Sequence, residues 1–148
     1  MKTPFTTAAF VALAVVALTA VVAAQPKPDF SGTWRLEKSS TGQGAPGAAN
    51  AVIVITQDAR TLTVKQAGFK TIVYRLDGAP AKNSRPGTSG EATYTTVWQG
   101  KKLVTTITGG LSGREERYIE GGLMVDFAEG QSSVGPSFAR TLYWKKVK

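Results

Sequence analysis

Beyond residue 50 the sequence is a series of short segments in which apolar and polar residues alternate, separated by turn residues. Leu62 and Val64, for example, alternate with threonine and lysine, and Asp77-Gly78 ends a later segment. A period of two is typical of a strand with one buried face, and Asp-Gly is a strong turn signal. No stretch beyond residue 50 shows the period of an amphipathic helix. The pattern predicts an all-β chain.

Nine strands are predicted, over residues 29–39, 51–57, 61–66, 69–76, 91–99, 102–108, 114–120, 123–129 and 137–146. Most are joined by tight turns, which favours an antiparallel meander. A long meander tends to close on itself and so removes its exposed edges. Because short links leave little room for Greek-key crossings, we expect an antiparallel up-and-down β-barrel of about eight to ten strands rather than a sandwich.

Three segments depart from simple alternation. Residues 51–57 are apolar on both parities, which is typical of a strand covered on both faces. Residues 39–50 and 79–90 are rich in glycine, proline and small polar residues and are predicted to be loops. The first loop is either a lid over a barrel mouth or an ordinary surface loop.

The barrel is expected to be organised around residues 29–39. Phe30, Gly32, Trp34 and Leu36 fall on one parity, and the residues between them are polar. Trp34 supplies a large apolar area, and Gly32 removes a side chain where another group can approach closely. We expect Gly32 and Trp34 to plug one end of the barrel.

Residues 1–24 have the features of a secretory signal peptide. Lys2 gives a positive start, residues 8–24 are almost continuously apolar, and small residues at 22–24 fit a signal peptidase site. An uncleaved membrane anchor is the alternative, because the apolar run is only slightly shorter than a membrane span. The cleavage-like site favours removal after Ala24. One exported domain, residues 25–148, would then remain in the periplasm or outside the cell, with no stable membrane insertion.

The chain contains neither histidine nor cysteine. It therefore lacks disulfides and the usual residues of neutral-pH acid–base catalysis, thiol chemistry and zinc binding. Glu115 and Glu116 are adjacent, so on a strand they face opposite sides and form no carboxylate pair. We expect no catalytic residue, no metal and no cofactor, and a cofactor-free enzyme ranks last among the possible functions.

The 18 basic residues outnumber the 10 acidic ones. Because the basic residues are scattered, the excess is either a solvated surface or a means of contact with an anionic envelope surface. We do not expect nucleic acid as a partner, and we expect a monomer.

Two motifs resemble those of calycins, the superfamily of lipocalins and intracellular fatty-acid-binding proteins. Gly32-Thr33-Trp34 resembles the Gly-x-Trp element of the calycin opening strand. Residues 138–146 resemble the closing strand, which in calycins pairs with the first strand and carries a basic residue near its tryptophan. The chain is most similar to small exported lipocalin-like domains of bacteria. The resemblance implies a barrel that binds a small hydrophobic or amphipathic ligand in its interior.

Two departures from fatty-acid-binding proteins are visible. The glycine-rich loop after the first strand stands where those proteins have a helical lid. They also hold a lipid carboxylate with an Arg-x-Tyr pair on the last strand, whereas here Arg140 and Tyr143 are three residues apart and lie on opposite faces.

An open interior is expected to be lined by Tyr74, Tyr94, Trp98, Phe127 and Arg140. Arg140 shares its parity with apolar residues of the closing strand, so we expect it to stack on Trp34; the alternative is that it holds the anionic head of a ligand. Arg75 and Arg117 are weaker candidates for the same role, and Asp126 is expected on the solvated face. If side chains fill the interior, the alternative function is a non-catalytic envelope structural or interaction protein.

The predicted signal peptide gives a first testable prediction. When the whole chain is expressed in a Gram-negative host, the isolated protein is expected to be soluble and to begin at Gln25, as intact-mass spectrometry would show. A membrane-bound product that keeps residues 1–24 would contradict cleavage and favour the anchor.

Overall fold

The computed structural model describes residues 26–40, 50–84, 90–132 and 135–148. These residues form ten strands and no helix, and so none of them builds a helix able to cross a membrane. The strands are β1 Gly32–Ser39, β2 Val52–Gln57, β3 Thr61–Gln66, β4 Ile72–Arg75, β5 Ala81–Ser84, β6 Glu91–Gln99, β7 Lys102–Thr108, β8 Leu111–Glu120, β9 Leu123–Ser132 and β10 Ser137–Lys146. The prediction of an all-β chain is confirmed.

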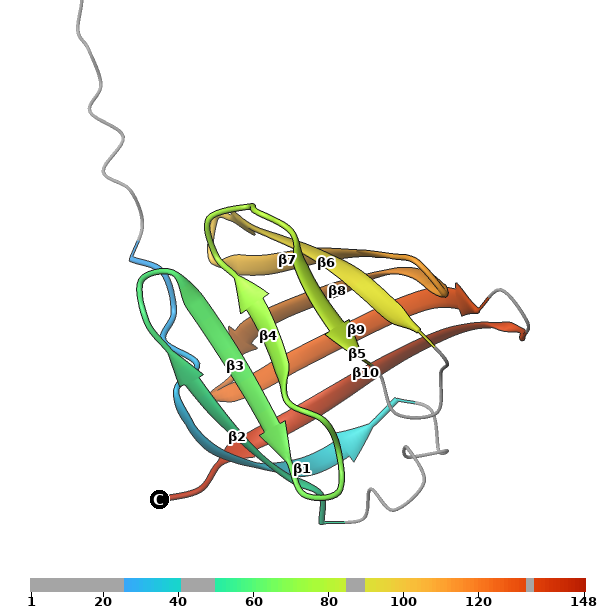
Figure 1. Cartoon of the computed structure of the whole chain (residues 1–148). Helices are drawn as coiled ribbons and strands as arrows, with labels where there is room; N and C mark the ends of the chain where they lie inside the picture. The colour runs from blue at the N-terminus through green and yellow to red at the C-terminus, as the bar shows by residue number, and fades with distance from the viewer. Residues whose placement is uncertain (1–25, 41–49, 85–89, 133–134) are drawn as a thin grey trace, which may run out of the picture.

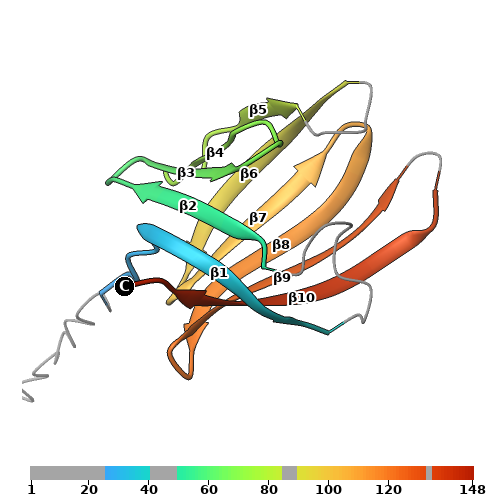
Figure 2. The ribbon, with the colours of Figure 1, turned by 90° about the horizontal axis from the view of Figure 1, so that it is seen from below.

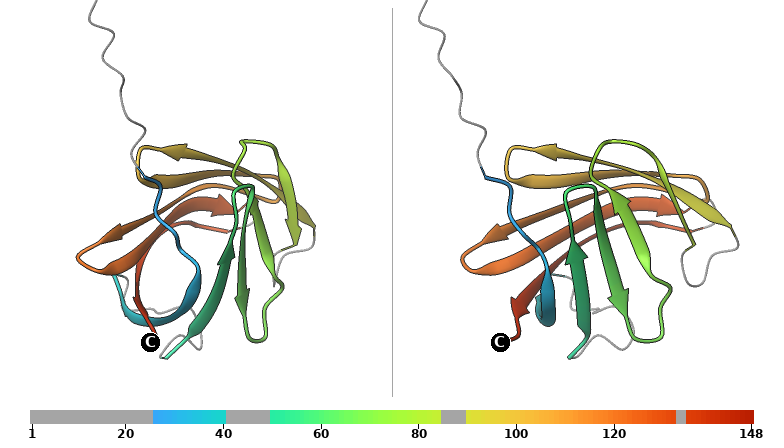
Figure 3. Two further views of the ribbon diagram at one scale, coloured as in Figure 1. Left: turned by 90° about the vertical axis from the view of Figure 1, so that its left-hand side faces the viewer. Right: turned by 60° about the vertical axis from the view of Figure 1, so that its left-hand side comes forward.

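The strands form one antiparallel sheet in the order β4-β3-β2-β1-β10-β9-β8-β7-β6-β5. Strands adjacent in sequence pair with one another except at β4 and β5, and the first strand pairs with the last. Figure 1 shows the sheet curling until β4 approaches β5, and Figure 2 shows β1 lying beside β10. In Figure 3, β2, β3 and β4, in green, form one wall, and the orange and red strands lie across from them. The predicted up-and-down barrel is confirmed, as is the pairing of its first and last strands.

β5 is the strand that sequence reasoning missed, because Ala81–Ser84 lies in the segment expected to be a loop. No backbone ladder joins β4 to β5, but the Asn83 side chain bridges them. Its Oδ1 accepts a hydrogen bond from the Val73 N–H, and its Nδ2 donates to the Val73 carbonyl, both at 2.9 Å. A side-chain amide offers the same donor and acceptor as a peptide group. The Asn83 side chain therefore takes the place of one backbone peptide group in the pairing of β4 with β5.

Burial alternates along β2 and β6, as expected for strands with one buried face. Ile53 and Ile55 of β2 are buried, whereas Val52 and Val54 between them are 40% and 42% exposed. The expectation that residues 51–57 are covered on both faces is therefore wrong, because the outside of the barrel wall carries no second layer here. The buried apolar core comprises Phe30, Trp34, Ile53, Ile55, Leu62, Tyr74, Ala92, Tyr94, Leu103, Ile107, Met124, Leu142 and Trp144.

Aromatic residues close the end of the barrel at which β1 begins. Trp34 is 3% exposed and its Nε1 donates a hydrogen bond to the Phe30 carbonyl at 2.8 Å. The Phe30 ring stacks on Trp98, with ring centroids 6.1 Å apart and planes inclined by 7°. This packing buries the large rings of Phe30 and Trp34.

The cation that stacks on Trp34 is Lys146, not Arg140 as predicted. Lys146 pairs with Trp34 across the β1–β10 ladder, and its Nζ lies 5.3 Å from the ring centroid. Arg140 lies six residues earlier on β10, which is about 20 Å along a strand. Gly32 makes the contact possible, since it has a φ of +131° and a Cβ there would lie 2.6 Å from Lys146 Cε.

Removal of the Asn83 amide tests whether it closes the barrel. Asn83→Leu keeps the side-chain size but leaves the partly buried N–H and carbonyl of Val73 without the amide that now binds them. Urea denaturation is expected to show a loss of about 2–4 kcal/mol. Lys82→Leu is the matched control, because Lys82 makes only an exposed ion pair with Glu91, and its effect should stay within about 0.5 kcal/mol. Equal effects of the two variants would contradict the bridge.

Candidate functional site

Four polar side chains gather inside the largely apolar barrel, and we call Tyr74, Glu115, Arg117 and Asp126 the interior polar cluster. The Tyr74 hydroxyl donates a hydrogen bond to Glu115 Oε2 at 2.9 Å. Arg117 Nη2 donates to Asp126 Oδ2 at 3.1 Å, and the guanidinium carbon lies 5.2 Å from the Tyr74 ring centroid. Tyr74, Glu115 and Arg117 are 2%, 7% and 5% exposed. The cluster thus joins a buried ion pair to a buried hydrogen bond.

The register of β8 and β9 brings these groups together. Arg117 faces Asp126 directly across the ladder. Glu115 lies two residues earlier on β8 and so shares the inward face. Glu116 faces outward, where two surface cations pair with it. The prediction that Glu115 and Glu116 face opposite sides is confirmed, and Tyr74 reaches Glu115 from β4 on the other wall.

Burial and neighbouring charges fix the protonation of the cluster. Burial is the main reason that the pKa of Tyr74 lies well above its ordinary value, and the Glu115 carboxyl raises it further. Burial lowers the pKa of Arg117, but Asp126, Tyr74 and Glu115 outweigh this effect and raise the pKa. At neutral pH the hydroxyl therefore remains a donor and the guanidinium remains charged.

Arg117 and Arg140 each keep a buried Nε that has no hydrogen-bond partner among the described residues. Arg140 faces inward on β10 opposite Ala128, and Ala128 pairs on its other side with Glu115. Only the small Ala128 stands between the positions of Arg140 and Glu115 on this wall. A buried donor without an acceptor costs about 1–3 kcal/mol. An acceptor supplied by a bound molecule would remove that cost.

Two of the aromatic residues predicted to line the interior lie together. Tyr94 is fully buried and meets Tyr74 edge to face, with centroids 5.6 Å apart and planes inclined by 77°. Trp98 faces inward but lies at the closed end, stacked on Phe30. The interior between them also holds a hydrogen-bonded hydroxyl pair, Thr96 and Thr105, at 2.9 Å.

The expectations for Phe127 and Asp126 are both wrong. Asp126 faces inward and pairs with Arg117. Side chains alternate along a strand, so Phe127 faces outward, opposite Glu116 on one side and Thr141 on the other. Leu123, Val125 and Phe127 share one apolar parity, so a period of two places them inside and Asp126 outside. The alternation was misleading here because the inward Arg117 supplies a partner for Asp126.

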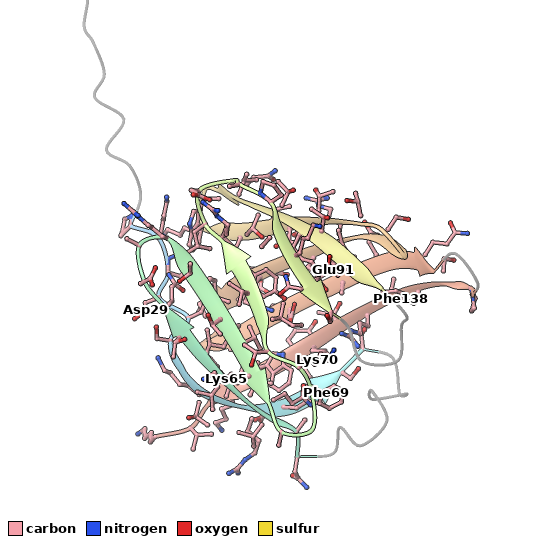
Figure 4. The ribbon with its side chains drawn as sticks, viewed as in Figure 1. Asp29, Lys65, Phe69, Lys70, Glu91 and Phe138 are labelled. Atoms are coloured by element: carbon pink, nitrogen blue, oxygen red, sulfur yellow. The ribbon has the colours of Figure 1, made fainter. Side chains whose placement is uncertain are left out.

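A shallow concavity of about 600 Å³ lies outside this cluster, at the ends of β8, β9 and β10. Its lining includes the cross-strand row Gly113, Gly130 and Phe138. A Cβ at Gly113 would collide with the Glu129 carbonyl, so the close approach of the two backbones needs glycine. Phe138 is 37% exposed at the start of β10 (Figure 4). Within the described residues, no three acidic side chains gather to hold a metal ion.

The Tyr74 hydroxyl gives a prediction with a definite pH dependence. Tyr74→Phe is expected to lose about 1–3 kcal/mol of stability at neutral pH, because Glu115 loses its donor. Tyrosine in the unfolded chain ionises near pH 10, whereas folded Tyr74 keeps its proton. The wild type therefore loses stability as pH rises past about 10, whereas the phenylalanine variant does not. The difference in unfolding free energy between the two proteins should narrow above that pH.

Urea denaturation between pH 7 and 11 measures that gap. Tyr118→Phe is the control, since Tyr118 lies on the outer face of β8 beneath Lys102. A gap that stays constant or widens above pH 10 would contradict the buried hydrogen bond.

The chain matches no family model and no curated protein. Solved structures do match it. The zebrafish ileal bile acid-binding protein with cholic acid has 19% identity and a TM-score of 0.61, and the match covers 80% of this chain and 98% of that chain. A mutant of the REP1-NXSQ fatty acid transporter has 17% identity and a TM-score of 0.61, covering 79% and 97%. A secretory abundant heat soluble protein from Ramazzottius varieornatus has 10% identity and a TM-score of 0.61, covering 80% and 95%.

Identities this low show a likeness of fold. All three neighbours are calycin-type barrels, in agreement with the resemblance of the opening and closing strands. The ten-stranded, nearly closed antiparallel barrel of this chain therefore has the calycin-type fold.

Proposed function

We propose that this chain is an exported lipocalin-like barrel that binds a small hydrophobic or amphipathic molecule in its interior. The observation that carries the proposal is the interior polar cluster, together with the buried Nε donors of Arg117 and Arg140. Replacing a buried ion pair with well-packed apolar residues is often neutral or stabilising. The retention of these charges inside an apolar core therefore suggests a use beyond stability.

The solved neighbours support binding rather than catalysis. The names of the neighbours include a bile acid-binding protein, a fatty acid transporter and a lipid binding protein from Caenorhabditis elegans. In this chain a ligand's apolar part would contact core residues such as Leu62 and Ile107, and its polar head would meet Arg117 and Arg140. An acceptor on the head would receive the two Nε donors that lack partners.

The end opposite Trp34 is the proposed entrance. Phe69, in the turn between β3 and β4, is 49% exposed, and Phe138 at the start of β10 is 37% exposed (Figure 4). Exposed aromatic rings at a barrel mouth offer an apolar molecule its first contacts. The signal peptide predicted over residues 1–24 supports export, and we propose that the protein acts as a monomer in the periplasm or outside the cell.

Arg140→Met tests whether Arg140 contacts the polar head of the ligand. Loss of the guanidinium is expected to weaken binding of a fluorescent long-chain carboxylate about tenfold or more, since charged hydrogen bonds contribute about 1.5–3 kcal/mol. Binding of the matching long-chain alcohol should change little. Stability in urea should be unchanged or higher, because a partly buried charge has been removed. Arg60→Met, at an exposed turn, is the matched control. An equal loss for both probes would contradict a head contact at Arg140.

Ala92→Trp tests whether the site lies inside the barrel. Ala92 is a buried inward residue of β6, and a tryptophan there would occupy interior space, so both probes should bind at least about tenfold more weakly. Val97→Trp, on the exposed face of the same strand, should leave binding unchanged. Wild-type protein that binds neither probe would instead indicate a filled barrel.

A further inference from the structure

Among the described residues, three cations on the outer faces of β10, β1 and β3 are not paired with carboxylates. Arg35, Lys65 and Lys145 are exposed there, and within the described parts of the chain none of them forms an ion pair. On the rest of the barrel the strand cations are paired with carboxylates: Arg75, Lys82, Lys102, Arg114 and Arg117. The charge of this wall is therefore left unneutralised.

The acidic residues are distributed in the same one-sided way. Residues 77–129 contain most of them, and only Asp29, Glu37 and Asp58 lie elsewhere in the chain. Asp29 precedes β1 and Asp58 follows β2, and their carboxylates accept hydrogen bonds from backbone N–H groups. Glu37 is the one exposed carboxylate on β1 itself. Most carboxylates therefore belong to the later strands, whereas Arg35, Lys65 and Lys145 belong to β1, β3 and β10.

Two of these cations face each other directly. Arg35 pairs with Lys145 across the β1–β10 ladder, and both side chains point outward. Like charges at opposed positions destabilise a sheet. A carboxylate at either position would relieve the repulsion and form an ion pair. The presence of two cations instead suggests that an anion outside the protein completes this surface.

Exposed valines lie among the cations. Val52 pairs with Arg35 and is 40% exposed, and Val54 pairs with Lys65 and is 42% exposed. β10, β1, β2 and β3 are consecutive in the sheet, and Figure 2 shows them side by side. We call Arg35, Val52, Val54, Lys65 and Lys145 the basic wall.

We propose that the basic wall docks on an anionic lipid bilayer. Cations near a bilayer surface are attracted by the negative headgroups, and aliphatic side chains between them can enter the interfacial region. A nucleic acid would be held through its phosphates and would have no use for the valines. This surface lies on the outside of the barrel, so the proposal is independent of what the interior binds.

The test compares two double variants that each remove two positive charges. Arg35→Gln with Lys145→Gln alters the basic wall, and Lys82→Gln with Lys102→Gln alters cations that are already paired elsewhere. Protein isolated after expression of the whole chain is sedimented with vesicles of phosphatidylglycerol and phosphatidylcholine, or of phosphatidylcholine alone. All variants share one N-terminus, so any contribution from residues 1–24 cancels in the comparison.

The wild type is expected to partition onto the anionic vesicles, and less so in 1 M salt, where the Debye length falls to about 3 Å. The basic-wall variant should partition roughly 30-fold more weakly, and the control variant within about threefold of the wild type. The urea midpoint of the basic-wall variant should be unchanged or higher, because a like-charge pair is gone, which would exclude unfolding as the cause. Equal partition of the two variants, or equal binding to neutral vesicles, would overturn the proposal. Binding to a DNA duplex without binding to vesicles would also overturn it.

Discussion

Closure of the sheet depends on the pairing of β1 with β10, the one ladder that joins strands from opposite ends of the chain. All other ladders link strands that follow each other directly, so their formation costs little loop entropy. The side-chain contacts at the start of β1 support this pairing. Gly32 leaves room for Lys146, Lys146 covers the Trp34 ring, and Trp34 binds the Phe30 carbonyl. A short glycine-tryptophan element at one end of the chain thus stabilises a barrel that its last strand completes.

The other side of the barrel closes without a ladder. Asn83 links β5 to Val73 of β4 through one side-chain amide, and Tyr74 of β4 is held from the opposite wall by its hydrogen bond to Glu115. Regions with few backbone hydrogen bonds are the first to open in native proteins. The interior polar cluster therefore has a structural part as well as the proposed binding role, because it ties the weakest edge of the sheet to β8.

Sequence reasoning succeeded where alternation was clean and failed where it was not. β6 and β10 have the same first and last residues in the structure as in the prediction. The fold class was predicted from the tight turns between successive strands. β5 was missed because a short polar segment among prolines and glycines has no period of its own. The faces of β9 were reversed because Leu123, Val125 and Phe127 form an apolar parity, whereas Asp126 faces inward to pair with Arg117. The Arg140 error had another cause: parity gives the face of a side chain but not its position along the partner strand.

The charged residues show most clearly that a sequence pattern does not reveal which side chains meet across strands. Residues 114–117 read Arg-Glu-Glu-Arg, which looks like a charge-balanced solvated strand. In the barrel, Arg114 and Glu116 pair outside, while Glu115 and Arg117 enter the core and find partners on β4 and β9. Likewise, nothing in the sequence places Arg35 beside Lys145, since the register of the first and last strands sets that contact. Composition therefore fixes how many charges a barrel must accommodate. Strand register decides which charges are neutralised inside it, and which remain on its surface for another molecule to neutralise.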